Sequence, residues 1–131
     1  MQKAEKITDG DGCIIRRYFE NGKLHRDAGP AVIEQYPDGR RCLAYYQRGK
    51  RHRENGPALI VQNGDGSGIE EYWQNGQRHR ARGPAWIQTS GDGVSEIEFW
   101  HAGKQIANVQ DDDRRPPPRR VRKPPIAPAQ R

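Results

Sequence analysis

The sequence has no long hydrophobic run. No window of 18 apolar residues occurs among its 131 residues, and a transmembrane helix requires about that length. The first residues, Met-Gln-Lys-Ala-Glu-Lys, lack the apolar stretch of a secretory signal peptide. We therefore expect a cytoplasmic protein without a transmembrane segment. Cysteine is also scarce, and two residues of this type cannot build a framework of disulfides.

Apolar residues are few, whereas residues that form turns are many. The apolar fraction is 32%, the mean hydropathy is −1.15, and the chain holds 15 glycines and 10 prolines. This content is low for a thick packed core, and the length allows one small domain. The composition therefore indicates short elements separated by frequent turns.

The net charge of +6 is unevenly distributed along the chain. Residues 106–131 contain seven Lys or Arg and three Asp, which leaves sixteen basic and fourteen acidic residues in the remaining 105. Most of the positive surplus therefore belongs to the C-terminal tail. The nearly balanced body is weak support for nucleic-acid binding by that part of the chain.

One unit of 27 residues recurs along the chain without insertion. A Gly-Pro-Ala triplet begins at residues 29, 56 and 83, and a His-Arg pair begins at residues 25, 52 and 79. Asp-Gly pairs begin at residues 11, 38, 65 and 92, and two neighbouring aromatic residues begin at 18, 45, 72 and 99. We define a repeat domain, 1–105, with repeats 11–37, 38–64, 65–91 and a half repeat 92–105.

Each unit predicts two β-strands. First strands are expected at 13–20, 40–47, 67–74 and 94–101, second strands at 31–36, 58–63 and 85–90, and a weaker second strand at 4–8. These segments are rich in β-branched and aromatic residues and lack proline. The Asp-Gly pairs predict hairpin turns, and the other connections are too short to cross over the sheet. The fold class is therefore all-β, a single antiparallel meander of seven or eight strands.

The second strands also indicate which residues share a face. The alanines 31, 58 and 85 and the isoleucines 33, 60 and 87 hardly change between copies, whereas the positions between them vary. Because adjacent residues point to opposite faces, we expect a packed constant face and an outward variable face. The variable face predicts a partner-binding surface with Leu59, Val61, Trp86 and Gln88. The alternative is that these side chains merely cover a thin sheet.

The segment Tyr72-Trp73-Gln74-Asn75-Gly76-Gln77-Arg78-His79, followed by Gly83 and Asp92-Gly93, resembles a MORN repeat. The unit here is longer, and it is more similar to a His-Arg-x-x-Gly-Pro-Ala variant found in bacterial and phage proteins. The resemblance covers residues 11–105. It implies a single-layer sheet that serves as a scaffold for proteins, is sometimes proposed to meet lipid, and has no catalytic residues. Some bacterial relatives are labelled antitoxins.

The recurrent histidines and the two cysteines are candidates for metal or redox chemistry. Equivalent histidines lie two strands apart, roughly 9–10 Å, which is awkward for zinc contacts of about 2.0–2.1 Å. We instead expect a turn residue that hydrogen-bonds the long connection, with no metal and no cofactor. Cys13 and Cys42 are separated by strand 31–36, too far for a disulfide, so reduced thiols are expected.

No motif predicts an enzyme. Glu70-Glu71 and the pair Glu96 and Glu98 have no counterparts in the first two copies, and no nucleophile motif or phosphate-binding loop occurs. We therefore expect a protein without catalytic residues.

The tail from 106 to 131 differs from the repeats in composition. Its proline runs favour extended, solvated chain, so the simplest prediction is a disordered end. Two alternatives are a ligand for an aromatic groove and an arm that contacts nucleic-acid phosphates. The side chains for such an arm are Arg114, Arg115, Arg119, Arg120, Arg122 and Lys123.

The function predicted best is a protein-binding module that occupies a partner's surface, as a stoichiometric inhibitor of the antitoxin or phage anti-defence (anti-CRISPR) kind. The alternative is a nucleic-acid-associated protein that uses the tail and exposed aromatic pairs as stacking platforms. Peripheral membrane binding is a third class, although no amphipathic helix supports it. Open sheet edges also allow a dimer by edge-strand pairing.

Overall fold

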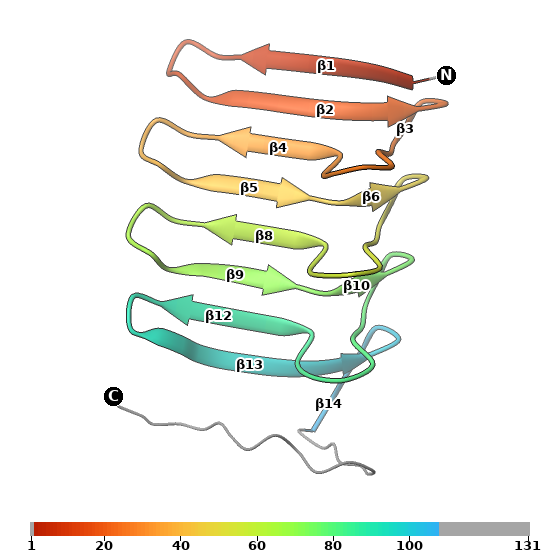
Figure 1. Ribbon diagram of the computed structural model, residues 1–131, viewed down its shortest axis with the longest axis vertical. Helices are drawn as coiled ribbons and strands as arrows, with labels where there is room; N and C mark the ends of the chain where they lie inside the picture. The colour runs from red at the N-terminus through yellow and green to blue at the C-terminus, as the bar shows by residue number, and fades with distance from the viewer. Residues whose placement is uncertain (1, 108–131) are drawn as a thin grey trace.

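The computed structural model describes residues 2–107, and its regular structure consists entirely of β-strands (Figure 1). One antiparallel sheet runs in the order β1-β2-β4-β5-β8-β9-β12-β13-β14. Its longer strands are β1 (Gln2–Thr8), β2 (Ile14–Glu20), β4 (Val32–Gln35), β5 (Arg41–Ala44), β8 (Leu59–Gln62), β9 (Gly68–Glu71), β12 (Trp86–Ser90) and β13 (Gly93–His101). The short strands are β3 (Lys23–Leu24), β6 (Tyr46–Gln47), β7 (Lys50–Arg51), β10 (Trp73–Gln74), β11 (Gln77–Arg78) and β14 (Lys104–Ile106).

This order confirms the predicted antiparallel meander, and each of the eight predicted strand positions holds a strand. Two predicted first strands are each divided in two. The strand at 40–47 forms β5 and β6, and the strand at 67–74 forms β9 and β10. At each division a tyrosine donates its N–H to the alanine that opens the next second strand. Tyr45 N–H bonds Ala58 C=O at 2.7 Å, and Tyr72 N–H bonds Ala85 C=O at 2.7 Å. The main sheet and the short hairpins thus separate at these tyrosines.

Three of the four Asp-Gly turns form three-residue hairpin loops, as the turn around Asp38 shows, whereas in the fourth Ser90 pairs with Gly93 across a two-residue loop. Gly39 N–H bonds Tyr36 C=O at 3.0 Å, and Tyr36 N–H bonds Arg40 C=O at 2.9 Å. Gly39 has a φ of 94°, which fits a type I turn followed by a glycine in the left-handed region. The Asp38 carboxylate accepts the Arg40 backbone N–H at 3.0 Å, and this bond is the main cause that lowers the pKa of Asp38.

A second set of turns was not predicted as tight hairpins. The connection expected at residues 21–30 begins with a two-residue turn, and its equivalents follow β6, β10 and β13. Both turn residues have positive φ, 52° and 85° at Asn75 and Gly76, and 52° and 85° at Arg48 and Gly49. This geometry is a type I′ turn, whose twist matches that of the flanking strands. We call the resulting hairpins β2–β3, β6–β7, β10–β11 and β13–β14 the tip hairpins.

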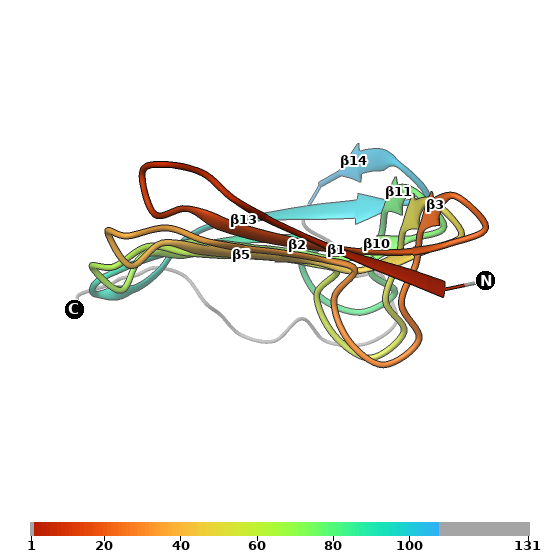
Figure 2. The same ribbon diagram turned by 90° about the horizontal axis from the view of Figure 1, so that it is seen from above.

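The sheet is a single layer with two different faces (Figure 2). The tip hairpins curl over one face, where Arg78 of β11 reaches Glu71 and the ring of Trp73. The rest of each connection, including Gly-Pro-Ala, packs on the opposite face, where Arg80 covers Tyr72. We call these the hairpin face and the connection face. Val32, Leu59 and Trp86 belong to the hairpin face by register.

Burial is limited because no described segment forms a second layer over the sheet. Ala31, Ala58 and Ala85 are fully buried, at 0% exposure, at the start of each second strand. The isoleucine column of the same face is only half-buried, like Leu59 and Val61 on the other face. The expectation of a packed constant face thus applies to its alanines alone. No large side chain within residues 2–107 is fully buried.

Candidate functional site

The four residues predicted to bind a partner share the hairpin face. Leu59 and Trp86 both lie opposite Glu71 in the register, one on each side of β9, and Val61 and Gln88 lie opposite Ile69 in the same way. Directly opposed residues of antiparallel strands point to the same side. All four side chains are half-buried. The sheet therefore brings them together as two neighbouring rows, which form the floor of the hairpin face.

The tip hairpins border this floor with alternating aromatic rings and guanidinium groups. The guanidinium carbon of Arg51 lies 5.4 Å from the Tyr46 ring centroid and 5.2 Å from that of Trp73. That of Arg78 lies 5.3 Å from Trp73 and 4.7 Å from Trp100. Both arginines therefore bridge the rings of successive repeats through cation–π contacts. We call Tyr46, Arg51, Trp73, Arg78 and Trp100 the ladder.

Sequence reasoning found the rings of the ladder but missed its arginines. Arg51 and Arg78 are 27 residues apart, so the repeat contained the signal. The first copy has Leu24 at that position, opposite Phe19, which makes the first step apolar. The ladder's charge is therefore restricted to the later repeats.

A buried carboxylate balances the ladder. Glu71 is buried, accepts the Trp73 Nε1–H at 2.7 Å, and lies 3.3 Å from Arg78 Nη2 and 4.0 Å from Arg51 Nη1. Glu98 repeats the motif by accepting the Trp100 Nε1–H at 3.0 Å. Glu71 and Glu98 thus lie beside the ladder arginines, and each also accepts an indole N–H. The hairpin face is thus rich in charged groups but close to neutral.

The connection face carries a row of stacked Arg–Tyr pairs. A guanidinium carbon lies 3.8 Å, 4.0 Å and 3.9 Å from the tyrosine ring centroid in the pairs Arg26–Tyr18, Arg53–Tyr45 and Arg80–Tyr72. In the third pair, Arg80 Nη1 also donates to Pro84 C=O at 3.1 Å. Gly83 has a φ of 109°, and a Cβ there would lie 3.1 Å from Arg80 Nη1. The recurring Gly-Pro therefore makes space for the arginine.

The histidines join successive repeats. His25 Nδ1 accepts the backbone N–H of Arg48 at 2.9 Å, and His52 Nδ1 accepts that of Asn75 at the same distance. The donor in each case is the first turn residue of the next tip hairpin. His25 Nε2 lies 2.9 Å from Asp27 Oδ1 of its own connection, as expected, and Nδ1 adds a hydrogen bond to the neighbouring repeat that was not expected. We call this contact the histidine lock.

One cluster has donor atoms of the kind that bind a metal. Glu20, His25 and Asp27 offer ligand atoms within 4.8 Å of one another, and His25 Nε2 lies 2.9 Å from Asp27 Oδ1 and 3.2 Å from Glu20 Oε1. However, Nδ1 accepts a hydrogen bond, so the neutral ring carries its proton on Nε2. A metal would need the lone pair at that atom. The chemistry therefore favours a donor to carboxylates over a ligand.

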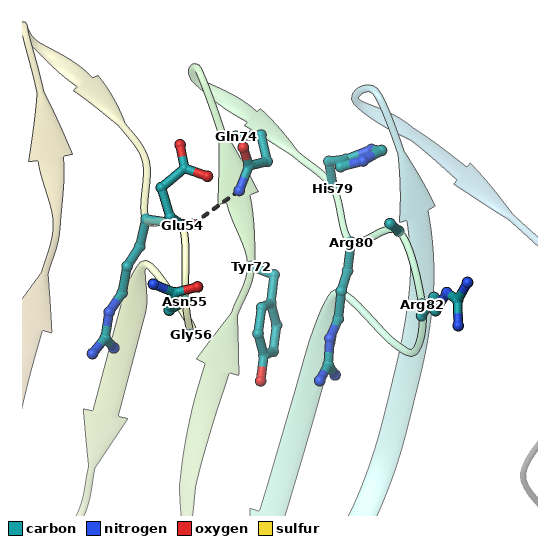
Figure 3. A pocket seen from close by; sticks show the side chains of 10 residues that line it. Glu54, Asn55, Gly56, Tyr72, Gln74, His79, Arg80 and Arg82 are labelled. Atoms are coloured by element: carbon teal, nitrogen blue, oxygen red, sulfur yellow. Dashed lines mark hydrogen bonds between the residues drawn. The ribbon is translucent and has the colours of Figure 1, made fainter.

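A polar groove of about 740 Å³ separates two successive connections on the connection face (Figure 3). Arg53, Tyr72 and Arg80 all line it, and the Tyr72 hydroxyl points in the same direction as the Arg80 guanidinium group. Arg82 and Glu54 lie at the rim. The lining thus holds three arginines and one carboxylate, and it is suited to anions. Sequence reasoning recognised Arg53, Tyr72 and Arg80 as members of repeating columns but did not predict a groove.

Both cysteines are free thiols, as predicted. Burial is the main cause that raises the pKa of Cys13 and the pKa of Cys42, so both remain protonated near neutral pH and are weak nucleophiles. Nearby, the Tyr36 hydroxyl donates to Glu34 Oε1 at 2.7 Å, and this bond raises the pKa of Tyr36 to about 12. The two thiols and the Tyr36 hydroxyl are therefore all protonated near neutral pH.

The tail residues Arg114, Arg115, Arg119, Arg120, Arg122 and Lys123 lie outside the described residues. β14 ends at Ile106, one residue beyond the boundary predicted for the repeat domain. No helix in the described part of the chain is long and apolar enough to cross a membrane.

Two comparisons with known proteins were made with the whole sequence. No model of a protein family matches the chain, and no curated protein matches it. The case for a function therefore rests on the chemistry of the two faces.

Proposed function

We propose that this is a non-enzymatic binding module whose hairpin face occupies the surface of a partner protein. The observation that supports it best is the floor, where Leu59, Val61 and Trp86 are half-buried in adjacent rows and keep part of their apolar surface accessible. Contiguous apolar surface on a small protein often marks an interaction site. Tryptophan is also enriched among the residues that dominate binding energy.

The ladder indicates the kind of contact that a partner would make. Its arginines are matched by Glu71 and Glu98, so the face offers little net charge for long-range attraction. Recognition would therefore depend on apolar contact and on shape. A projecting aliphatic or aromatic side chain of a partner would pack on the apolar surfaces of Leu59 and Trp86, beside the ladder.

The biological role we propose is stoichiometric inhibition of a cytoplasmic partner, of the antitoxin or phage anti-defence kind. Support comes from the resemblance of the repeats to MORN-like units and from the small size of the molecule. An inhibitor of this kind needs a rigid surface and no reaction centre.

The test uses charge substitutions on the two faces. Leu59→Glu and Trp86→Glu place a carboxylate on the floor, whereas Ile60→Glu and Ile87→Glu are matched controls on the opposite face of the same strands, equally half-buried. Co-purification from the native host identifies the partner, and nuclease treatment excludes association through nucleic acid. We expect the floor variants to weaken binding by about thirtyfold or more, as for residues at the centre of an interface.

The controls should retain binding at an unchanged unfolding midpoint. If the control variants weaken binding as strongly as the floor variants, the connection face is the contact surface and the proposal is wrong. Circular dichroism of each variant separates lost binding from lost folding.

Nucleic-acid binding is the second candidate, and the connection face favours it. The groove of Figure 3 combines Arg53, Arg80 and Arg82 with the ring of Tyr72, and cations interleaved with aromatic groups suit single strands. Binding of single-stranded RNA that falls steeply with salt, and weakens further in Arg82→Glu, would support this function. Deleting residues 106–131 then separates the contribution of the tail.

A further inference from the structure

We propose that copies of this protein associate head to tail, with β1 of one copy pairing with β13 of the next. The partner in this contact is a second copy of the chain. The inference is independent of the proposed function, because it concerns the two ends of the sheet and neither of its faces.

Both ends of the sheet are open edges in the described part of the chain. β1 pairs with β2 alone, over seven residues from Gln2 to Thr8. β13 pairs with β12 on one side, and on the other side β14 covers only Phe99 to His101. Between Gly93 and Glu98 that side of β13 has no partner strand among residues 2–107. An unpaired row of N–H and C=O groups is a template for another strand.

Exposed apolar side chains gather at these same two ends. The large hydrophobic residues that stand out as exposed are Ile7 on β1 at 38%, Val94 and Ile97 on β13 at 67% and 39%, and Ile106 on β14 at 39%. The inner strands β2 to β12 carry none. Repeat proteins that stay monomeric usually end in units with a polar outer surface. Neither end of this sheet has such a cap within residues 2–107.

The two end strands are of complementary types, because first and second strands alternate along the repeats. β1 is a second strand, since Ala4 falls 27 residues before Ala31, and its one partner strand among residues 2–107 is β2. β13 is a first strand, and no strand of the second type follows it within the described residues. β1 of another copy supplies the missing type of strand.

Charge favours pairing of β1 with β13 over pairing of two β1 edges or of two β13 edges. β1 carries Lys3, Glu5 and Lys6, a net +1, whereas the outer part of β13 carries Glu96 and Glu98, a net −2. Two β13 edges would therefore repel each other, as would two β1 edges, while β1 and β13 attract. A head-to-tail contact of this kind leaves one unpaired edge at each end of a dimer, so association continues beyond a dimer.

Two charge variants test the arrangement. Lys3→Glu with Lys6→Glu makes β1 acidic, and Val94→Lys with Glu96→Lys makes β13 basic. All four side chains are exposed, so the monomer should fold normally, which circular dichroism verifies. Sedimentation velocity of the full chain then gives the mass distribution as a function of protein and salt concentration.

We expect the unmodified protein to grow with concentration from 15.0 kDa to species larger than a dimer, and salt to reverse this growth. Each variant alone should stay at the monomer mass, because its two edges now carry the same sign. An equimolar mixture should associate again, because the acidic β1 of one variant meets the basic β13 of the other. A monomer at every concentration overturns the proposal. A variant that still dimerises alone shows a symmetric contact and overturns it equally.

Discussion

At the scale of single residues, the histidine lock shows how one side chain does a task that sequence reasoning only half foresaw. His25 was expected to bond its own connection, and it does contact Asp27 there. Its Nδ1, however, accepts a backbone N–H from the next repeat. The partner could not be identified from sequence because it lies 23 residues away, on a tip hairpin whose shape was not predicted.

The third histidine makes this contact sensitive to pH. His79 Nδ1 accepts Ala102 N–H at 2.9 Å, and the His101 ring lies 4.9 Å away, centroid to centroid. Burial, and secondarily His101, lowers the pKa of His79 from its ordinary 6.5. Below pH about 6.5 the unfolded chain therefore binds more protons at this site than the folded chain, and the free energy of unfolding falls.

We expect the urea concentration at the unfolding midpoint of the unmodified protein to decrease between pH 7 and pH 5. The midpoint of His79→Gln should decrease less, because glutamine has no proton to gain in this range and its side-chain oxygen can still accept the Ala102 N–H. The measurement is urea unfolding followed by tryptophan fluorescence across this range. Parallel profiles for the two proteins would show that His79 does not contribute to the loss.

At the scale of elements, the tip hairpins test the turn rule directly. Type I′ turns favour asparagine at their first position, and repeats one and three have Asn21 and Asn75 there. The second repeat has Arg48, at a φ of 52°. A long side chain in the left-handed region is strained relative to asparagine.

Arg48→Asn should therefore raise the free energy of unfolding by about 0.5–1 kcal/mol. The backbone N–H that the histidine lock uses is retained, and the Arg48 side chain is exposed. The converse control, Asn75→Arg, should lower stability by a similar amount in the same denaturation experiment. If neither variant changes the free energy of unfolding, the backbone conformation of these turns does not contribute to global stability.

The strands were predictable to a large extent, and the short hairpins were not. Strand positions followed from runs of β-branched and aromatic residues, and the Asp-Gly turns followed from glycine. Asn75-Gly76 is an equally good turn signal, but the strand that follows it, β11, has only two residues, which is too short to produce a strand pattern in the sequence. The Asn-Gly signal is also missing from the second repeat, where the first turn residue is Arg48, and arginine is not a typical turn residue.

The floor of the candidate site could be predicted from the sequence, whereas the ladder that borders it could not. Alternation along single strands was enough to group Leu59, Val61 and Trp86 on one face, because a strand's geometry is local. The ladder depends on hairpins that fold over that face. Its arginines could be placed only once the position of β7 and β11 was known.

At the scale of the whole molecule, a single layer of repeats has a graded stability. Each repeat contacts only its neighbours, so the ends have one supporting interface and the middle has two. We expect the slowest amide exchange at inner N–H groups such as those of Tyr45 and Tyr72, which bond Ala58 and Ala85. Exchange should be fastest in β1 and β14.

Hydrogen exchange followed by mass spectrometry checks this gradient at dilutions where the chain is monomeric. At high concentration the proposed head-to-tail contact should slow exchange in β1 and β13 selectively. Uniform protection across all strands would instead indicate one cooperative unit.

The histidine lock also bears on how such a chain can change over generations. The same joint links His25 to Arg48 and His52 to Asn75 across an identical interval. Recombination that removed residues 38–64 would leave His25 facing Asn75, with the joint intact. Gain or loss of one whole unit therefore requires no new interface, so the gene can vary the length of the hairpin face while the chemistry of each junction stays the same.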